Sequence, residues 1–145
     1  MIKLIEFQKI IFTKKHIQIF KNWAFKCQPN EAPAILVGRI EEESYKGIVS
    51  DVYPVPNEKK SQLSFQIDLE DYYRIYQLAK EKKKKIIGIF HSHPMDPIPS
   101  GVDMPFLKFN QNIWVILSTT QKVDNLKAYQ WINNKLNKIE IIIID

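Results

Sequence analysis

The loop at residues 90–103 constrains this chain most, because it places two histidines, a serine and an aspartate close together. Its sequence is FHSHPMDPIPSGVD, and it follows an apolar run at residues 86–90 that is typical of a buried strand. His91 and His93 lie two residues apart, so in an extended backbone their imidazoles point to the same side. The prolines that follow exclude a helix and stiffen the loop, which lets Asp103 return as a third ligand.

This ligand set predicts a catalytic metal. Imidazole nitrogen and carboxylate oxygen both bind zinc, and three protein ligands leave the fourth position open for water. Cys27 is the only cysteine, so neither an internal disulfide nor a thiolate metal cluster is possible. We therefore expect one Zn²⁺, held through nitrogen and oxygen by His91, His93 and Asp103.

Composition is typical of one globular domain spanning residues 1–145. The chain is 45% hydrophobic and 26% charged, and no apolar run approaches the length that crosses a bilayer. The first residues scatter charges among apolar side chains, unlike a secretory signal. We therefore expect a cytoplasmic protein with no membrane partner.

The net charge of +5 permits an acidic partner without requiring one. The main basic run, at residues 80–85, follows an amphipathic helical pattern, where cations favour the C-terminal end of the helix dipole. Aromatic residues are not interleaved there, so we expect a solvated helix end and no nucleic-acid partner. A zinc deaminase acting on a base would need cysteine ligands and an adjacent glutamate, which this sequence lacks.

Helical periodicity precedes the loop in two places. Thr13 is a good N-cap for a helix over residues 14–27, and His16 near its start is expected to be a packing or surface residue. Asp68 can cap a second helix. Its predicted buried face consists of Leu69, Tyr72, Tyr73, Tyr76 and Ala79.

Short apolar or alternating runs predict strands elsewhere. They lie at residues 2–11, 34–37, 48–55, 63–67, 86–90, 113–118, 127–131 and 139–144. A short helix is predicted from Asp103, with Phe106 and Leu107 facing inward, and residues 54–64 are predicted to form a loop. Strands before and after two helices, without regular βαβ alternation, indicate an α/β fold with a mixed sheet flanked by helices.

A zinc hydrolase also needs a general base, and several carboxylates are available. Asp96 lies within the loop between two prolines, and Glu31 lies just before the buried strand at 34–37. A cluster at residues 41–43 lies in a predicted hairpin turn, where a solvated turn is the favoured interpretation. The cluster consists of Glu41, Glu42 and Glu43. Sequence spacing alone does not choose among these groups.

The loop resembles the signature of the JAMM (MPN-domain) zinc isopeptidases, in which His-x-His-Pro is followed by a short spacer and Ser-x-x-Asp. His91, His93, Pro94, Ser100 and Asp103 carry this pattern here. The spacer before the serine has six residues where seven are usual. The resemblance implies an MPN/JAMM domain, an α/β fold related to the cytidine deaminases, with zinc bound by the two histidines and the aspartate.

The same family places its general base in a Glu-x-x-x-x-Leu-x-Gly pattern at the start of a strand. Glu31, Leu36 and Gly38 match this pattern, and Pro33 stands where many members have glycine. The resemblance therefore implies Glu31 as the general base. Ser100 is expected to face the oxyanion together with the metal rather than to act as a nucleophile, since activated water already supplies one.

The expected function is a zinc-dependent isopeptidase that removes ubiquitin or a ubiquitin-like modifier after its Gly-Gly tail, and a proteasome-like complex is a further expected partner. A close variant would trim the C-terminus of a sulfur-carrier protein of the same fold. The other alternative is a non-catalytic MPN scaffold, although such scaffolds usually lack the metal ligands. A free strand edge beside the site, with the loop at 54–64, is expected to hold the tail by main-chain hydrogen bonds.

Overall fold

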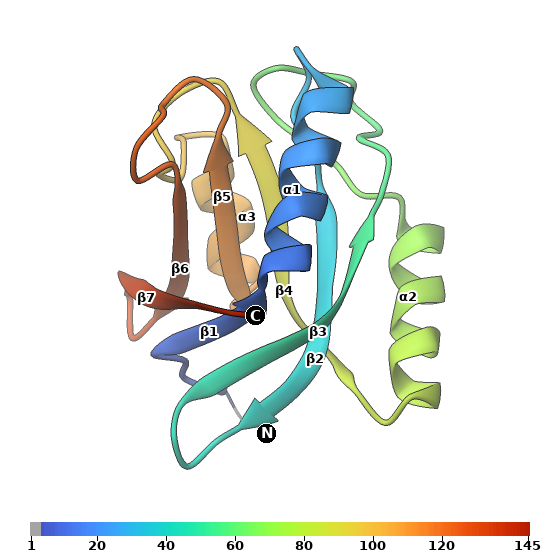
Figure 1. The fold of residues 1–145 in the computed structure, drawn as a ribbon, viewed down its shortest axis with the longest axis vertical. Helices are drawn as coiled ribbons and strands as arrows, with labels where there is room; N and C mark the ends of the chain where they lie inside the picture. Colours follow the sequence, from blue (N-terminus) through green and yellow to red (C-terminus); the bar gives the residue numbers. More distant parts are fainter. Residues whose placement is uncertain (1–3) are drawn as a thin grey trace.

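The computed structural model describes residues 4–145, and within them the chain forms three helices and seven strands (Figure 1). In chain order these are β1 Lys9–Thr13, α1 Lys14–Cys27, β2 Ala34–Glu41, β3 Lys46–Pro54, α2 Leu69–Glu81, β4 Lys85–His93, α3 Asp103–Phe109, β5 Ile113–Ser118, β6 Leu126–Ile132 and β7 Lys135–Ile144. None of these helices is long and apolar enough to cross a bilayer. The predicted α/β class, with a mixed sheet and flanking helices, is confirmed.

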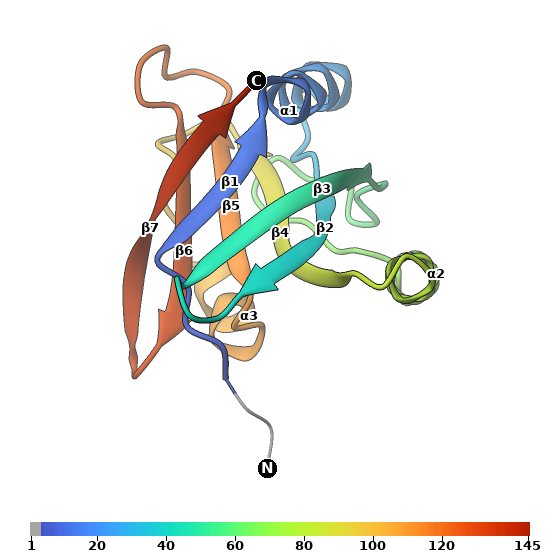
Figure 2. The same cartoon turned by 60° about the horizontal axis from the view of Figure 1, so that its bottom comes forward.

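The strands form one mixed sheet that closes on itself in the order β1-β3-β2-β4-β5-β6-β7. β1 runs parallel to β3 and β7, β4 runs parallel to β5, and the other pairs are antiparallel. Figure 2 shows β7, β1 and β3 side by side across one face. Closure gives each of these seven strands two neighbours, but β3 pairs with β1 only through Lys46, Gly47 and Ile48. Within the described part of the chain, residues 49–54 of β3 therefore keep one edge without a strand partner.

Helix α1 begins as predicted, because Thr13 caps it. The Thr13 hydroxyl accepts the His16 N–H at 3.3 Å, and the Thr13 N–H donates to Nδ1 of His16 at 3.0 Å. The other ring nitrogen of His16 donates to the Ser50 carbonyl at 3.1 Å. His16 is therefore a capping and packing residue, as expected. Further along α1, Phe20 stacks on Phe90 of β4 with ring centroids 4.2 Å apart.

Strands β2 and β4 are buried on both faces, which explains their continuous apolar runs. Leu36 and Phe90 belong to the main core, whereas Ile35 packs in a second cluster beneath α2. Gly38 lies where the pairing register of β2 shifts, and a Cβ there would collide with the carbonyl oxygen of Ile48. Only glycine allows this close backbone approach.

The N-terminal strand is shorter than predicted. Strand β1 begins at Lys9, so residues 4–8 of the strand predicted at 2–11 lie outside it, and residues 2 and 3 of that prediction lie outside the described part. The buried Gln130 amide holds the preceding segment instead: Phe7 N–H donates to its Oε1 at 2.8 Å, and its Nε2 donates to the Ile5 carbonyl at 2.6 Å. A side chain here takes the place of a strand partner.

The strand predicted at residues 63–67 is wrong, because this segment is a loop. Its alternation reflects packing on different neighbours: Phe65 lies against His91, and Ile67 packs in the cluster beneath α2. Its backbone bonds to the Asn57 side chain instead of to a strand.

The helices are less buried than predicted. Helix α2 buries Ile75 and Ala79, while Leu69, Tyr73 and Tyr76 are exposed. It lies outside the closed sheet and contacts β2 and β4 along a narrow stripe (Figure 1). In α3, Leu107 faces inward as predicted, but Phe106 is exposed.

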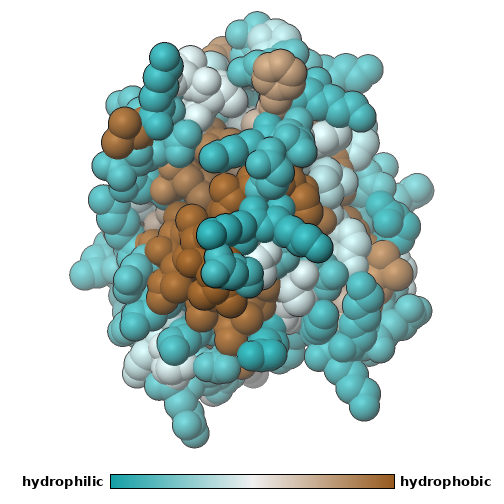
Figure 3. Space-filling view, in the orientation of Figure 1, coloured by the Kyte–Doolittle hydropathy of each residue, from teal (hydrophilic) through white to brown (hydrophobic). Residues whose placement is uncertain are grey.

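The basic segment at residues 80–85 ends α2 and lies at the surface, as expected. Lys82 and Lys84 form ion pairs with Asp51 of β3 at 3.6 and 3.3 Å. On the face shown in Figure 3, hydrophobic side chains gather beside α1, and hydrophilic side chains surround them.

Candidate metal centre

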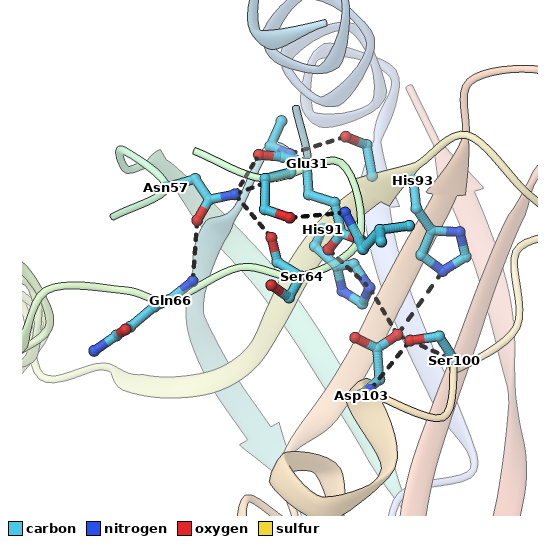
Figure 4. Close-up of polar contacts among 12 residues, drawn as sticks. Glu31, Asn57, Ser64, Gln66, His91, His93, Ser100 and Asp103 are labelled. Atoms are coloured by element: carbon cyan, nitrogen blue, oxygen red, sulfur yellow. Dashed lines mark hydrogen bonds and ion pairs between the residues drawn. The ribbon is translucent and has the colours of Figure 1, made fainter. Parts of the chain in front are cut away.

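The two histidines of β4 and the first residue of α3 converge at one point (Figure 4). Oδ2 of Asp103 lies 3.1 Å from Nε2 of His91 and 3.9 Å from Nε2 of His93. All three side chains are at most 2% exposed. Ligand atoms of a tetrahedral zinc, each about 2.0–2.1 Å from the metal, lie about 3.3 Å apart. The observed spacing therefore suits a small divalent cation.

Buried polar atoms at this point lack hydrogen-bond partners, which tests whether a metal fits. Both carboxylate oxygens of Glu31 and Nε2 of His93 are buried and make no hydrogen bond with the described residues. Buried polar atoms normally have partners. A cation bound among His91, His93 and Asp103 would coordinate Nε2 of His93. A water beside the cation could donate hydrogen bonds to the Glu31 carboxylate.

The protonation states favour metal binding. Burial lowers the pKa of His93, and the adjacent His91 lowers it further, so the neutral, ligand-competent imidazole is favoured. Burial acts to raise the pKa of Asp103. Hydrogen bonds from His91 and the Ser100 N–H outweigh it and hold the pKa of this carboxyl below its ordinary value. A charged carboxylate beside a neutral imidazole is the combination that a metal requires.

Glu31 lies just before β2, where the backbone around it is fixed on two sides. The Glu31 N–H donates to the Ser61 carbonyl at 2.8 Å, and the next residue, Ala32, donates to Oγ of Ser92 at 3.0 Å. Oε1 of Glu31 lies 3.9 Å from Nε2 of His91. Burial, and then the negative charge of Asp103, raise the pKa of Glu31 to about 8. A cation held by Asp103 would offset that negative charge and lower the pKa of Glu31, so the carboxylate could accept a proton near neutral pH.

The other candidate carboxylates lie away from this point. The cluster at residues 41–43 is exposed at the turn between β2 and β3, and Asp96 is exposed in the loop after β4. Among the carboxylates that the sequence offered as a base, the structure brings Glu31 to the metal ligands.

Ser100 lies beside Asp103 despite the shortened spacer. Its N–H donates to Oδ2 of Asp103 at 3.0 Å, and its hydroxyl oxygen accepts the Asp103 N–H at 3.1 Å. Because the hydroxyl oxygen accepts this bond, the hydroxyl hydrogen is left to donate elsewhere. Ser100 therefore both orients Asp103, a candidate metal ligand, and offers a hydroxyl hydrogen for donation at the site.

Three contributing residues were missed from the sequence. Ser92 points away from the histidines and bonds Ala32, an arrangement that strand alternation could have indicated. Asn57 bonds the backbone of Glu31, and Phe65 stacks on the ring of His91 with centroids 4.7 Å apart. No local pattern signalled these two, because their partners are distant in sequence.

A small cleft beside His93 is lined mostly by polar residues, and we call it the polar cleft. Its volume is about 260 Å³. It is lined by Gln28, Pro29, Asn30, Gln62, Ser92, His93, Pro94, Thr119 and Thr120. On the side of His91, Phe65 and Trp114 line an apolar groove of about 970 Å³. Among these hollows, only the polar cleft is lined by one of the three candidate ligands.

Comparisons with known proteins agree with this arrangement. The sequence matches the family described as prokaryotic homologues of the JAB domain over residues 13–132. Desampylase of Pyrococcus furiosus is 31% identical over 93 residues, which cover 61% of this chain and 63% of the length of desampylase.

Solved structures resemble the whole chain. A protein from Desulfitobacterium hafniense, solved in solution, has a TM-score of 0.83 at 27% identity, covering 94% of this chain and 93% of its own. A protein from Salinibacter ruber has a TM-score of 0.65 at 22% identity, and the match covers 92% of this chain and 91% of the Salinibacter chain. A JAB1/MPN domain protein from Archaeoglobus fulgidus has a TM-score of 0.59 at 18% identity, and the match covers 95% of this chain and 98% of the Archaeoglobus chain. The last two show the shared fold.

The family match includes the candidate base, the HSHP motif and the Ser-x-x-Asp motif, and the fold is that of a JAB1/MPN protein. The resemblance drawn from the metal loop is therefore confirmed. This chain belongs to the family of prokaryotic JAB-domain proteins.

Proposed function

We propose that this protein is a zinc-dependent isopeptidase that removes a ubiquitin-like modifier after its Gly-Gly tail. One observation carries the proposal: an unpartnered, buried Glu31 carboxylate lies 3.9 Å from His91, within a buried His-His-Asp set. A non-catalytic scaffold has no need of a base at this point. Similarity to desampylase supports the same class of activity.

The residues divide the chemistry among them. His91, His93 and Asp103 would hold the zinc, which supplies a Lewis acid and a water whose pKa falls from about 15.7 to about 7. Beside the zinc, Glu31 would accept a proton from the attacking water and return it to the departing amine. The Ser100 hydroxyl donates to the amide oxygen as negative charge develops there.

The polar cleft beside His93 supports a thin substrate. Its volume of about 260 Å³ is below the roughly 300–1,000 Å³ of small-molecule sites, so it can hold only a short stretch of substrate. Two glycines let an extended main chain approach where a side chain would collide. The tail would bind in this cleft, where its scissile amide would lie next to His93.

The test is cleavage of a fusion between a ubiquitin-like protein and a reporter, joined after Gly-Gly. We expect cleavage that a metal chelator abolishes and that a thiol-blocking reagent leaves unchanged, because Cys27 has no role in it. A fusion whose tail is Leu-Leu should resist. Equal cleavage of both tails would contradict the substrate, and absence of cleavage in any zinc-loaded sample would contradict the function.

A free sulfur-carrier protein with residues beyond its Gly-Gly end is a second substrate for the same assay. Trimming of that protein without cleavage of modifier conjugates would assign the processing activity instead. We further propose that the enzyme acts in the cytoplasm, and association with a proteasome-like complex can be examined by copurification.

A further inference from the structure

Asn57 is a buried polar residue that the chemistry above does not use. It is 8% exposed, and it lies in the loop between β3 and α2. Its Nδ2 donates to the carbonyls of Glu31 and Ser64 at 3.1 and 3.0 Å, and its Oδ1 accepts the N–H of Gln66 at 3.1 Å (Figure 4). The same Oδ1 accepts the N–H of Lys59 at 3.0 Å. A side-chain amide has two donor hydrogens and two acceptor lone pairs, so these four bonds saturate it.

The position of Glu31 depends on this loop. Its carboxylate makes no hydrogen bond with the described residues, so no side-chain partner orients it. Its backbone is held instead: the carbonyl accepts from Asn57, and the N–H donates to Ser61 of the same loop. Both main-chain polar groups of the candidate base are therefore anchored to residues 57–61.

The loop also contacts a metal ligand. Phe65 lies between Ser64 and Gln66, which are both partners of Asn57. Its ring stacks on His91 with centroids 4.7 Å apart. Asn57 thus connects the backbone of the base to the segment that packs on the ligand nearest to it.

We propose that Asn57 is a positioning residue that sets the approach of the Glu31 carboxylate to the metal centre. This inference rests on the proposed function, because it assigns Asn57 an effect on the proton transfer that Glu31 performs. Reacting groups must meet within narrow limits, and a displacement of about 1 Å can cost about 10²-fold in rate. Loss of the Asn57 donors should therefore lower kcat while the substrate, which Asn57 does not contact in this account, keeps its KM.

The Asn57→Asp variant tests this most sharply. The aspartate retains oxygen acceptors for Lys59 and Gln66 but loses both hydrogens that Nδ2 donates, including the one to Glu31. We expect kcat to fall about 10- to 10²-fold, with zinc content and KM unchanged. Asn57→Ala, which also removes the acceptor, should lower kcat at least as far.

Gln130 supplies a matched control. It is a buried amide, 1% exposed, that bonds the backbone of Phe7, Ile5 and Gln111. Gln130→Ala removes comparable hydrogen bonds outside the proposed site. It should lower stability and leave kcat unchanged at temperatures where the protein is folded.

Amide hydrogen exchange in metal-free protein gives a readout independent of activity. In Asn57→Asp, the Glu31 amide should exchange faster than in the wild type, while Gln66 retains protection. In Gln130→Ala both should keep wild-type rates.

The outcomes separate the two proposals. A wild type that cleaves no substrate contradicts the proposed function, and the positioning role falls with it. An active wild type with unchanged kcat and unchanged Glu31 exchange in Asn57→Asp overturns the positioning role alone. An equal fall of kcat in Gln130→Ala also overturns the positioning role, because the loss of any buried side-chain amide would then be enough to lower kcat.

Discussion

Oε1 of Glu31 lies 3.9 Å from Nε2 of His91, and neither side chain is exposed to solvent. This proximity makes Glu31 the described carboxylate best placed to exchange a proton with water at the metal centre. Glu31→Gln keeps the shape of the side chain and removes its basicity. We expect turnover to fall at least about 10²-fold with zinc content and fold unchanged.

The matched control replaces the exposed acidic cluster. A triple variant carrying Glu41→Gln, Glu42→Gln and Glu43→Gln should retain wild-type turnover, because these side chains lie at the turn between β2 and β3. If Glu31→Gln remained active while the triple variant was inactive, the general base would belong to the acidic cluster and not to Glu31.

Ser100 should contribute to the rate beyond its structural bond. Ser100→Ala removes the hydroxyl that accepts the Asp103 N–H, and with it the donor proposed for the oxyanion. We expect kcat to fall about 10²- to 10³-fold. Ser100→Thr retains a hydroxyl and should recover part of the rate. Steady-state kinetics would exclude the donor role if Ser100→Ala kept wild-type kcat.

Gly38 should tolerate no side chain. A Cβ there would meet the backbone carbonyl of Ile48, which a strand pair cannot move aside without disturbing its register. Gly38→Ala should lower the free energy of unfolding by about 1–3 kcal/mol, the usual cost of overpacking. At Gly101 a Cβ would meet no atom within 4 Å, so Gly101→Ala is the control. Equal urea midpoints for the two variants would refute the steric explanation.

Asp51 should make stability sensitive to acid. Burial acts to raise its pKa, but hydrogen bonds from Ser50 and Lys84 and the charges of Lys84 and Lys82 lower it overall. A lowered folded-state pKa adds stability above the unfolded pKa of about 3.9, and this is lost as pH falls through the folded value.

Because these groups are partly exposed, Asp51→Asn should cost only about 0.2–1 kcal/mol at pH 7. Urea unfolding across pH should show wild type and variant converging below the folded-state pKa, and high salt should narrow the difference at pH 7. A difference that persists at the acid limit would show that packing, rather than charge, is responsible.

The sequence predicted the parts of the fold whose causes are local. Helix α1 has its predicted bounds because Thr13 supplies the cap, and β5 has its predicted bounds because its apolar run is buried on every side. The convergence of His91 and His93 at the end of β4 was predictable for the same reason, because two histidines at strand spacing must share a face. Glu31 followed from the family pattern, not from spacing.

Features that depend on distant partners were not predictable from local pattern. Closure of the sheet requires β1 to pair with β7, from the other end of the chain. The segment at residues 63–67 alternates like a strand, yet Asn57 supplies its hydrogen bonds. The buried stripe of α2 is narrower than its apolar pattern because the helix packs outside a closed sheet.

Zinc content tests the central claim most directly. Protein purified without added metal should contain about one zinc per chain by elemental analysis, because His91, His93 and Asp103 form a buried three-ligand set. The double variant His91→Ala with His93→Ala should contain none while Glu31→Gln retains the full amount. Unchanged zinc in the double variant, or a wild type that takes up no zinc, would contradict the account.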